Sequence, residues 1–466
     1  MMRKIVNPSS INNLESPRLT LTIYFALWKA LLLTLVLLSP GPGYDVSTHL
    51  LPNFEPVDAA SSVLRRAQHH LASRLIRWDA IYFSQIARRG YVFEQEWAFG
   101  WGHTRLLAFV GHWVAGSREV AGVEDVVLAG MVLAHLFHWM SVIVLYDLTL
   151  EVWKAKKRQK VVTFAFLCAA LHIVSPAGVF LSAPYAESTF SLLNFVGCYL
   201  YAKALRRQSK DAEVVAAGLL LLSGVVCGVA TTFRGNGLLS GLLFVLGAGK
   251  EVAHFLVNVK NRARRDALLA FRRLLYFGLS GALMACTAFW PQYFAFQHIC
   301  VDLHDGKGRP WCYSYLPSVY SWVQQEYWGV GFLRYWTMSN IPLFMLAAPM
   351  LVIMISSSIW AWIEGSSRNG NLIRYGDVPP MTVVLHLAMP QLVLCLLALT
   401  TYHVQIITRL SSGYPIWYWW LAVLVVRHPE MATLGTRFKV SKGILRWMVL
   451  YGIIQAGFYA SFLPPA

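Results

Sequence analysis

The 466-residue chain is 56% hydrophobic and only 14% charged, with a mean hydropathy of +0.49. This composition excludes a water-soluble globular enzyme and is typical of a polytopic membrane protein. The net charge of +17 would indicate a nucleic-acid partner in a soluble chain. In a membrane protein, an excess of Lys and Arg more often sets the orientation of the spans, so we expect no nucleic acid.

Apolar runs long enough to cross a bilayer recur along the whole chain. They cover residues 21–39, 127–150, 160–181, 186–203, 214–233, 236–256, 274–297, 338–363, 380–402, 414–426 and 445–463. The sequence therefore predicts an all-α polytopic membrane protein, a single domain over 1–466 with about eleven transmembrane helices. The first run lacks a small-residue cleavage site, so we expect a retained anchor. Residues 104–116 are too short to span and predict an interfacial helix.

Basic segments fall on alternate turns between these runs. They lie at 154–160, 203–210, 260–273, around Arg368 and Arg374, and at 427–446. With the N-terminal Arg3, Lys4 and Arg18 in the cytosol, every basic segment is also cytosolic. The remaining loops are then luminal: a first loop at 40–126 with interfacial helices, a second large loop at 298–337, and shorter ones at 172–188, 231–237 and 401–415.

The luminal loops carry nearly all the unusual chemistry, being rich in His, Arg, Gln, Tyr, Trp, Pro and Gly. A site assembled from loops on one face suits an enzyme whose substrate is a lipid in that leaflet. A transporter would place its site near the bilayer midplane, often between internal repeats, and the sequence shows no such repeat. A lipid or sugar transporter and a non-catalytic subunit of a glycosylation complex stay as alternatives.

Five blocks in the luminal loops together resemble one known family. They are "RWDAIYFSQIARRGY" (77–91), "SPAGVFLSAPYAES" (175–188), "FRGNGL" (233–238), "PWC" followed by "YWGVGFLRYW" (310–336), and "HVQIITR" (403–409). In this order they resemble the GPI mannosyltransferase 2 family, which adds the second mannose to the glycosylphosphatidylinositol (GPI) anchor precursor. Where animal members carry a Phe-Pro segment, this chain has "FGWGHTRLL" (99–107), which indicates a fungal-type member.

The resemblance implies a multi-pass enzyme of the endoplasmic-reticulum membrane, of the GT-C class of glycosyltransferases, with its active site on the luminal face. It implies mannose transfer from dolichyl-phosphate-mannose in an α-1,6 linkage, with no cofactor and no nucleotide sugar. It also implies an acidic residue in the first luminal loop and a small companion membrane subunit.

Asp79 is the predicted general base. Displacing dolichyl phosphate from the anomeric carbon requires a more nucleophilic acceptor hydroxyl, which a carboxylate provides, and no general acid because phosphate is a stable leaving group. From the residues alone, Asp79 could equally be a helix N-cap or the partner of Arg77 or Arg65. Glu94 and Glu96 are the next choices for the base.

Aromatic residues surround Asp79 in the sequence. Trp78, Tyr82 and Phe83 are expected to anchor a short helix at the luminal membrane edge and so to fix the depth of the carboxylate.

Cations near the luminal ends of the spans are the predicted phosphate ligands, because a planar Arg fork suits phosphate. Arg234 precedes Gly-Asn-Gly, which allows close backbone approach and includes Asn236. A snorkelling arginine is its alternative. The predicted substrate-binding residues are Arg77, Arg234, Asn236, Tyr185, Glu187, His403, Gln405 and Arg409. Glu187 could instead cap a helix that restarts after Pro184, and a structural role for His403 is as well supported as binding.

The chain has seven cysteines, of which Cys300 and Cys312 fall in one luminal loop. An oxidising compartment favours a disulfide between them. No Cys/His cluster has zinc-site spacing and no Asp-rich metal motif occurs, so the sequence predicts no metal.

Overall fold

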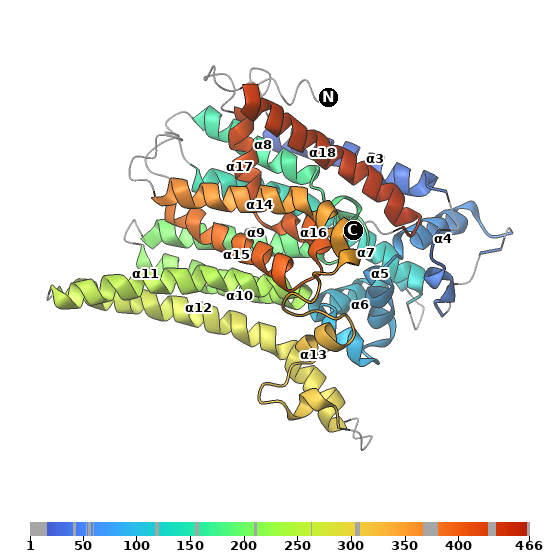
Figure 1. Cartoon of the computed structure of the whole chain (residues 1–466), viewed down its shortest axis with the longest axis horizontal. Helices are drawn as coiled ribbons and strands as arrows, with labels where there is room; N and C mark the ends of the chain where they lie inside the picture. The colour runs from blue at the N-terminus through green and yellow to red at the C-terminus, as the bar shows by residue number, and fades with distance from the viewer. Residues whose placement is uncertain are drawn as a thin grey trace.

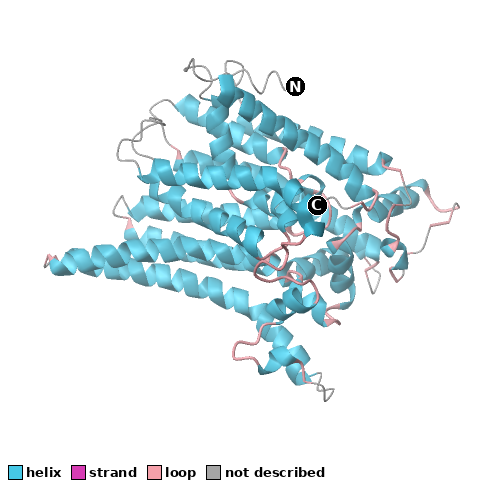
Figure 2. Cartoon of the chain, viewed as in Figure 1, coloured by secondary structure: helices cyan, strands magenta, loops and turns pink. Residues whose placement is uncertain are grey.

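The computed structural model describes residues 16–463 except 41–42, 53, 55–56, 59, 117–120, 154–157, 209–211, 262, 303–307, 367–380 and 427–434. Over these residues the chain consists of helices and connecting loops, which confirms the predicted all-α class for this part of the molecule (Figure 2). The basic residues Arg3, Lys4, Arg368 and Arg374, and the basic segments 154–157 and 427–434, lie outside the described residues.

Each predicted apolar run contains a helix, and these helices lie roughly parallel (Figure 1). They are α3 (Pro17–Leu38), α7 (Val123–Val152), α8 (Arg158–Ile173), α9 (Glu187–Gln208), α10 (Glu213–Phe233), α11 (Gly241–Lys260), α12 (Arg264–Phe296), α14 (Ile341–Ser366), α15 (Met381–Thr400), α17 (Ile416–Val426) and α18 (Gly435–Ala460). Within the described residues, seven helical segments are long and apolar enough to cross a membrane. The chain is therefore multi-pass, and the number of crossings stays a prediction.

Several predicted spans are shorter or differently divided in the structure. Helix α8 ends at Ile173 because Pro176 follows, and a residue before proline is pushed out of the helical region. Residues 178–181 form the separate 3₁₀ helix η3 (Gly178–Leu181). Another 3₁₀ helix, η4 (Gly235–Ser240), precedes α11. Helix α17 has 11 residues, about half the length that a transmembrane helix needs.

Close packing in the bundle depends on small residues. Helix α10 packs against both α9 and α12. At Gly224 of α10, a Cβ atom would lie 2.6 Å from the carbonyl oxygen of Ser280 on α12. Glycine at this position therefore lets the two backbones approach, as small residues do in membrane helix pairs.

Residues 40–126, predicted to be luminal and here called the first loop, contain short helices at one end of the bundle, on the right in Figure 1. These are η1 (Ser47–Leu50), α4 (Val63–Leu75), α5 (Asp79–Arg89), η2 (Glu94–Ala98) and α6 (Trp101–Ala115). Helix α6 corresponds to the predicted helix at 104–116, and it packs against α5, α7 and α10.

The second large loop follows directly after α12. Helix α12 has 33 residues, so it is about 50 Å long and exceeds the roughly 30 Å hydrocarbon core. It continues into the π-helical η5 (Gln297–Asp302), followed by η6 (Pro310–Tyr313), α13 (Val319–Glu326) and η7 (Met338–Asn340). The second large loop lies beside the first loop, below it in Figure 1.

Between α15 and α17 the chain forms only short turns: η8 (Val404–Ile406), α16 (Ile407–Leu410) and η9 (Ser411–Gly413). These turns occupy the predicted loop at 401–415. Arg409 lies on α16 and faces α5, where it pairs with Asp79.

Candidate active site

Asp79 is the first residue of α5 and follows a backbone turn. The preceding residue, Trp78, has φ of 55°, a left-handed conformation that is unusual for a residue with a side chain. Trp78 is the N-cap residue, so the N-cap alternative for Asp79 is wrong. The ion-pair partner of Asp79 is Arg409 in place of Arg77 or Arg65, because Oδ2 of Asp79 lies 2.9 Å from Nη2 of Arg409.

Four charged side chains form a continuous series of ion pairs. Arg409 also approaches Glu187, with its Nε 3.5 Å from Oε1. The same oxygen of Glu187 lies 2.6 Å from Nη1 of Arg234. The charges thus alternate in the order Asp79, Arg409, Glu187, Arg234. We call these four residues the charged network; they come from α5, α16, the start of α9 and the end of α10.

The members of the charged network differ in how far their side chains are exposed. Glu187 is completely buried, whereas the side chains of Arg234 and Arg409 are each 14% exposed and that of Asp79 is 32% exposed. Burial by itself lowers the pKa of the Arg409 guanidinium, but the carboxylates of Asp79 and Glu187 outweigh burial and raise that pKa above its ordinary value. Arg409 therefore stays charged beside the Asp79 carboxylate.

The exposed parts of the network face a cavity of about 650 Å³. This volume is in the range of small-molecule sites, roughly 300–1,000 Å³. Its lining includes Asp79, Arg234, Asn236, His403 and Arg409 of the predicted residues, with Phe83, Phe99, Trp101, Tyr320, Gln324, Trp328 and Tyr402. One wall is apolar and comes from η4 and the end of α12, namely Leu238, Ala285, Ala288 and Phe289. A polar headgroup and an apolar chain could both contact this cavity.

Aromatic hydroxyl groups supply hydrogen-bond donors to the cavity. Burial raises the pKa of Tyr320 to about 12 and also raises the pKa of Tyr402. Both phenols therefore keep their protons at neutral pH and can donate to a ligand. Neither tyrosine could be selected from the sequence, because Tyr320 falls within 311–336, where Trp and Tyr are usually membrane-interface residues, and no local pattern distinguishes Tyr402.

Four predicted binding residues do not line the cavity: Glu187, which pairs with the two arginines of the charged network, and Tyr185, Arg77 and Gln405. Tyr185 is buried and its hydroxyl donates to the carbonyl of Arg77, 2.9 Å away. The Arg77 guanidinium points to the chain's C-terminal end, where Nη1 donates to Thr48 Oγ1 at 2.7 Å and Nη2 to the carbonyl of Ala460 at 3.3 Å. Gln405 accepts a hydrogen bond from the Tyr335 hydroxyl at 3.0 Å. These contacts give Tyr185, Arg77 and Gln405 structural partners.

Asn236 and His403, the other two predicted ligands that line the cavity, are held in place by hydrogen bonds and ring contacts to neighbouring residues. Nδ2 of Asn236 donates to the hydroxyl of Tyr414 at 3.1 Å. Nε2 of His403 lies 3.0 Å from the carbonyl of Trp328, and its ring stacks on Tyr335. Both residues therefore border the cavity with a fixed orientation.

The aromatic residues around Asp79 have ring partners within the protein, and their anchoring at the membrane edge stays a prediction. Trp78 contacts the Phe462 ring at 5.1 Å, and Tyr82 stacks on Phe99 at 4.5 Å. Phe83 is buried and also contacts Phe99. The position of Asp79 is thus set by tertiary packing.

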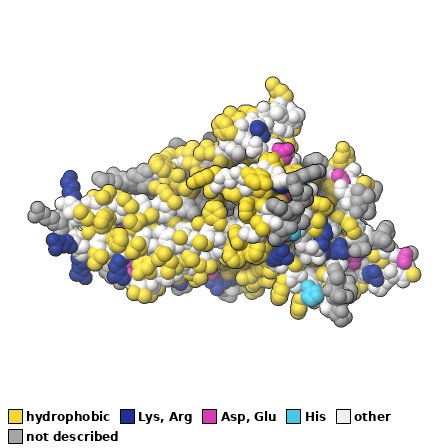
Figure 3. Space-filling view, turned by 90° about the horizontal axis from the view of Figure 1, so that it is seen from below, with side chains coloured by type: hydrophobic (Ala, Val, Ile, Leu, Met, Phe, Trp, Pro, Cys, Tyr) yellow, Lys and Arg dark blue, Asp and Glu magenta, His cyan; other side chains and the backbone are white. Residues whose placement is uncertain are grey.

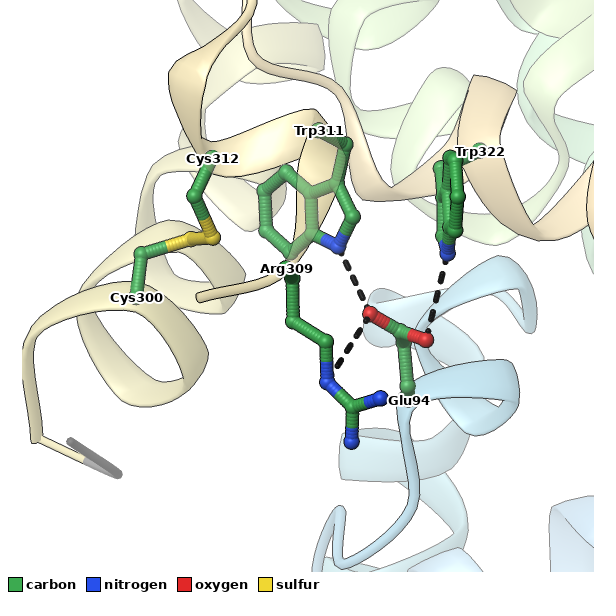
Figure 4. Close-up of a disulfide and its surroundings, with 6 residues drawn as sticks. All are labelled: Glu94, Cys300, Arg309, Trp311, Cys312 and Trp322. Carbon is green, nitrogen blue, oxygen red and sulfur yellow. Dashed lines mark hydrogen bonds and ion pairs between the residues drawn. A yellow bond between two sulfur atoms is a disulfide. The ribbon is translucent and has the colours of Figure 1, made fainter. Parts of the chain in front are cut away.

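Glu94 is not available as a base, because its carboxylate joins the first loop to the second large loop (Figure 4). It accepts hydrogen bonds from Nε1 of Trp311 at 2.6 Å, Nε1 of Trp322 at 3.2 Å and the Tyr327 hydroxyl at 3.0 Å. Arg309 lies 3.9 Å away. Such a saturated, buried carboxylate stabilises the contact between the loops.

Glu96 is also occupied by structural partners. Both its oxygens accept from Arg89, at 3.1 and 2.6 Å, and Oε2 accepts from the backbone N–H groups of residues 92 and 93. Asp79 is thus the one of these three carboxylates that lines the cavity.

The predicted disulfide is present in the structure between Cys300 and Cys312 (Figure 4). It joins η5 to η6, directly beside Trp311 and its contact with Glu94. Among the described residues, no group of three or more His, Cys, Asp or Glu side chains is arranged to hold a metal ion.

Long apolar helices with a charged cavity at one end define a multi-pass membrane protein with a polar site near its helix ends. The mannosyltransferase (PIG-V) family matches residues 18–466. Proteins named GPI mannosyltransferase 2 from Aspergillus oryzae and Aspergillus fumigatus are each 39% identical to the chain, over 99% of it and over 99% and 95% of their own lengths. One from Yarrowia lipolytica is 31% identical over 96% of the chain and 99% of its length. The chain belongs to the PIG-V mannosyltransferase family and is a mannosyltransferase.

Among solved structures, the chain is similar to the Archaeoglobus fulgidus oligosaccharyltransferase tethered with an acceptor peptide. The TM-score is 0.45 at 12% identity, covering 95% of this chain and 55% of that one. The same enzyme with an inhibitory peptide and a dolichol-phosphate gives 0.44 at 11% identity, covering 95% and 56%. The chain spans about half the length of that oligosaccharyltransferase.

Proposed function

We propose that this chain transfers mannose from dolichyl-phosphate-mannose to the first mannose of a GPI-anchor precursor, in an α-1,6 linkage with inversion at the anomeric carbon. The observation that carries the proposal is the Asp79 carboxylate, partly exposed in the cavity and paired with Arg409. The relatives named GPI mannosyltransferase 2 support the choice of reaction.

In the proposed step, Asp79 acts as the general base. Its carboxylate takes the proton of the acceptor hydroxyl as that oxygen bonds to the anomeric carbon of the donor mannose. The bond from this carbon to the phosphate oxygen breaks, and its electron pair leaves with dolichyl phosphate. Attack from the face opposite the phosphate inverts the configuration.

Arg234 and Arg409 are the proposed ligands of the donor phosphate. Both guanidinium groups border the cavity, and each has donor nitrogens beyond those paired with Glu187. Glu187 holds the two cations side by side, so we assign it a positioning role. Because the donor carries its own leaving group, the proposed reaction uses no cofactor.

The orientation that we propose places the cavity in the lumen of the endoplasmic reticulum and the N-terminus in the cytosol. Lys and Arg side chains lie at the end of the bundle where α11 and α12 meet, on the left in Figure 3, and others lie on the right. The cavity lies among the proposed luminal loops at the right-hand end. The basic segment between α11 and α12, far from the cavity, supports the positive-inside assignment. A site at the helix ends also fits an enzyme better than the transporter alternative, which requires a site near the midplane.

Under this proposal, the helical bundle with its luminal site is of the GT-C class. A small companion membrane subunit remains an expectation from the family resemblance.

The test is mannose transfer by the purified full-length protein. It receives dolichyl-phosphate-mannose and a GPI precursor with one mannose, and the products are analysed for a second mannose and its linkage. We expect an α-1,6-linked second mannose only when both substrates are present. Transfer from a nucleotide sugar in place of the dolichyl donor, or a different linkage, would contradict the proposal.

A further inference from the structure

The turn that presents Asp79 is held by side chains from three other segments of the chain. Three consecutive carbonyl groups precede the turn, and each accepts a hydrogen bond from a different hydroxyl. The Leu75 carbonyl accepts from Tyr459 at 2.8 Å, that of Ile76 from Thr48 at 2.7 Å, and that of Arg77 from Tyr185 at 2.9 Å.

Residues 459–462 make further contacts with this turn besides the hydrogen bond from the Tyr459 hydroxyl to the Leu75 carbonyl. The Tyr459 hydroxyl also lies 3.4 Å from the Arg77 carbonyl. The Ala460 carbonyl accepts from the Arg77 guanidinium, which lies 4.7 Å from the centre of the Phe462 ring. Phe462 in turn contacts Trp78. Residues 459–462 therefore contact the turn through all these groups, and none of the four residues lines the cavity.

Backbone strain coincides with this contact. Trp78 and Phe462 have φ angles of 55° and 58°, and both are non-glycine residues in the left-handed region. Such conformations persist where the surrounding structure over-determines them, and they are concentrated at functional sites. Here the two strained residues pack on each other, immediately next to Asp79.

We propose that residues 459–462, at the C-terminal end of the chain, are a positioning element for Asp79. They hold the strained turn at Trp78 so that the carboxylate meets the acceptor hydroxyl in the reactive geometry. The inference rests on the proposed role of Asp79 as base. It also gives Arg77 a function other than substrate binding, since its guanidinium fastens the turn to the C-terminal segment.

The test is a double-mutant cycle on purified full-length protein, with Tyr459→Phe and Asp79→Glu. Tyr459→Phe removes only a hydroxyl that does not line the cavity. We expect kcat to fall about tenfold, because small misplacements of reacting groups cost that much or more. The KM values for both substrates should stay unchanged. In the Asp79→Glu protein, whose carboxylate is already displaced, Tyr459→Phe should lower kcat by less than about twofold.

Tyr201→Phe is the matched control. Its hydroxyl donates to the carbonyl of Leu243 at 2.9 Å, is equally buried and lies within the helical bundle. This variant should keep a normal kcat. If Tyr459→Phe does not accumulate, Phe462→Leu takes its place in the cycle, because it removes the ring contacts with Trp78 and Arg77 and keeps an apolar side chain.

Two results would overturn the inference and leave the proposed function intact. One is a normal kcat for Tyr459→Phe. The other is an equal loss in the Asp79→Glu protein, which a merely structural hydroxyl would produce. Normal turnover of both Asp79→Glu and Asp79→Asn would instead remove the role of Asp79, and the inference with it.

Discussion

Asp79 and Arg409 form the closest contact between a cavity-lining carboxylate and a cation in the site. Local sequence suggested Arg77 as the partner because it is only two residues away. In the structure, the turn at Trp78 sends the two side chains to opposite sides: Asp79 toward the cavity and Arg77 toward Ala460. Sequence could select Arg77 and Arg409 as candidate substrate ligands, but their different roles depend on this backbone turn.

Arg234→Lys should weaken donor binding and leave the protein folded. Lysine keeps a charge near Glu187 but loses the planar fork that can bind a second anion while one nitrogen is paired. We expect the KM for dolichyl-phosphate-mannose to rise about ten- to a hundredfold, since a hydrogen bond to a charged group contributes roughly 1.5–3 kcal/mol. The check is steady-state kinetics with each substrate varied. Arg66→Lys, on the exposed side of α4, is the control, and an unchanged donor KM for Arg234→Lys would contradict the phosphate role.

The helices themselves were the most predictable elements. Long apolar runs identify spans whatever their neighbours are, so each run corresponds to a helix in the structure. The turns at 404–413 were not predictable in the same way. Their short helices are set by contacts with α9 and α14, which the sequence does not show. Since Arg409 lies on one of these turns, its pairing with both Asp79 and Glu187 could not be inferred from spacing.

At the scale of helix packing, Gly224→Ala should destabilise the contact of α10 with α12. The added Cβ would lie 2.6 Å from a backbone oxygen of Ser280, so the helices must separate. Overpacking of this kind costs about 1–3 kcal/mol, which should lower the melting temperature in detergent. Gly218→Ala is the matched control on the same helix, because a Cβ there meets nothing within 4 Å. Equal melting temperatures for the two variants would show that α10 does not approach α12 so closely.

For the molecule as a whole, the proposed topology assigns the two ends of the bundle to different compartments. Reporter fusions after residues 157 and 265 should be cytosolic, and an Asn-x-Ser/Thr sequon introduced near Gly308 should be glycosylated. The measurement is the mass shift on removing glycans from microsomal protein. Glycosylation at a sequon placed near residue 157 would reverse the orientation and move the cavity to the cytosolic face.

The arrangement of the whole molecule also explains why the proposed reaction depends on the Asp79 carboxylate. Charged groups from α5, α9, α10 and α16 converge at the cavity, yet among Asp79, Glu94, Glu96 and Glu187 only Asp79 lines it. The other three carboxylates are buried against cations, indole N–H groups or backbone N–H groups. A reaction that needs a carboxylate base in this cavity therefore depends on Asp79.

The most direct measurement is the turnover of purified Asp79→Asn protein with dolichyl-phosphate-mannose and the mono-mannosylated GPI precursor, beside the wild type and Asp58→Asn. Asp58 is an exposed residue of the same luminal loop, so its variant makes the same chemical change away from the cavity. We predict normal abundance and melting temperature for both variants, and normal turnover for Asp58→Asn. The turnover of Asp79→Asn should fall by about two to four orders of magnitude, the range for loss of a general base. Near-normal turnover of folded Asp79→Asn would contradict the account.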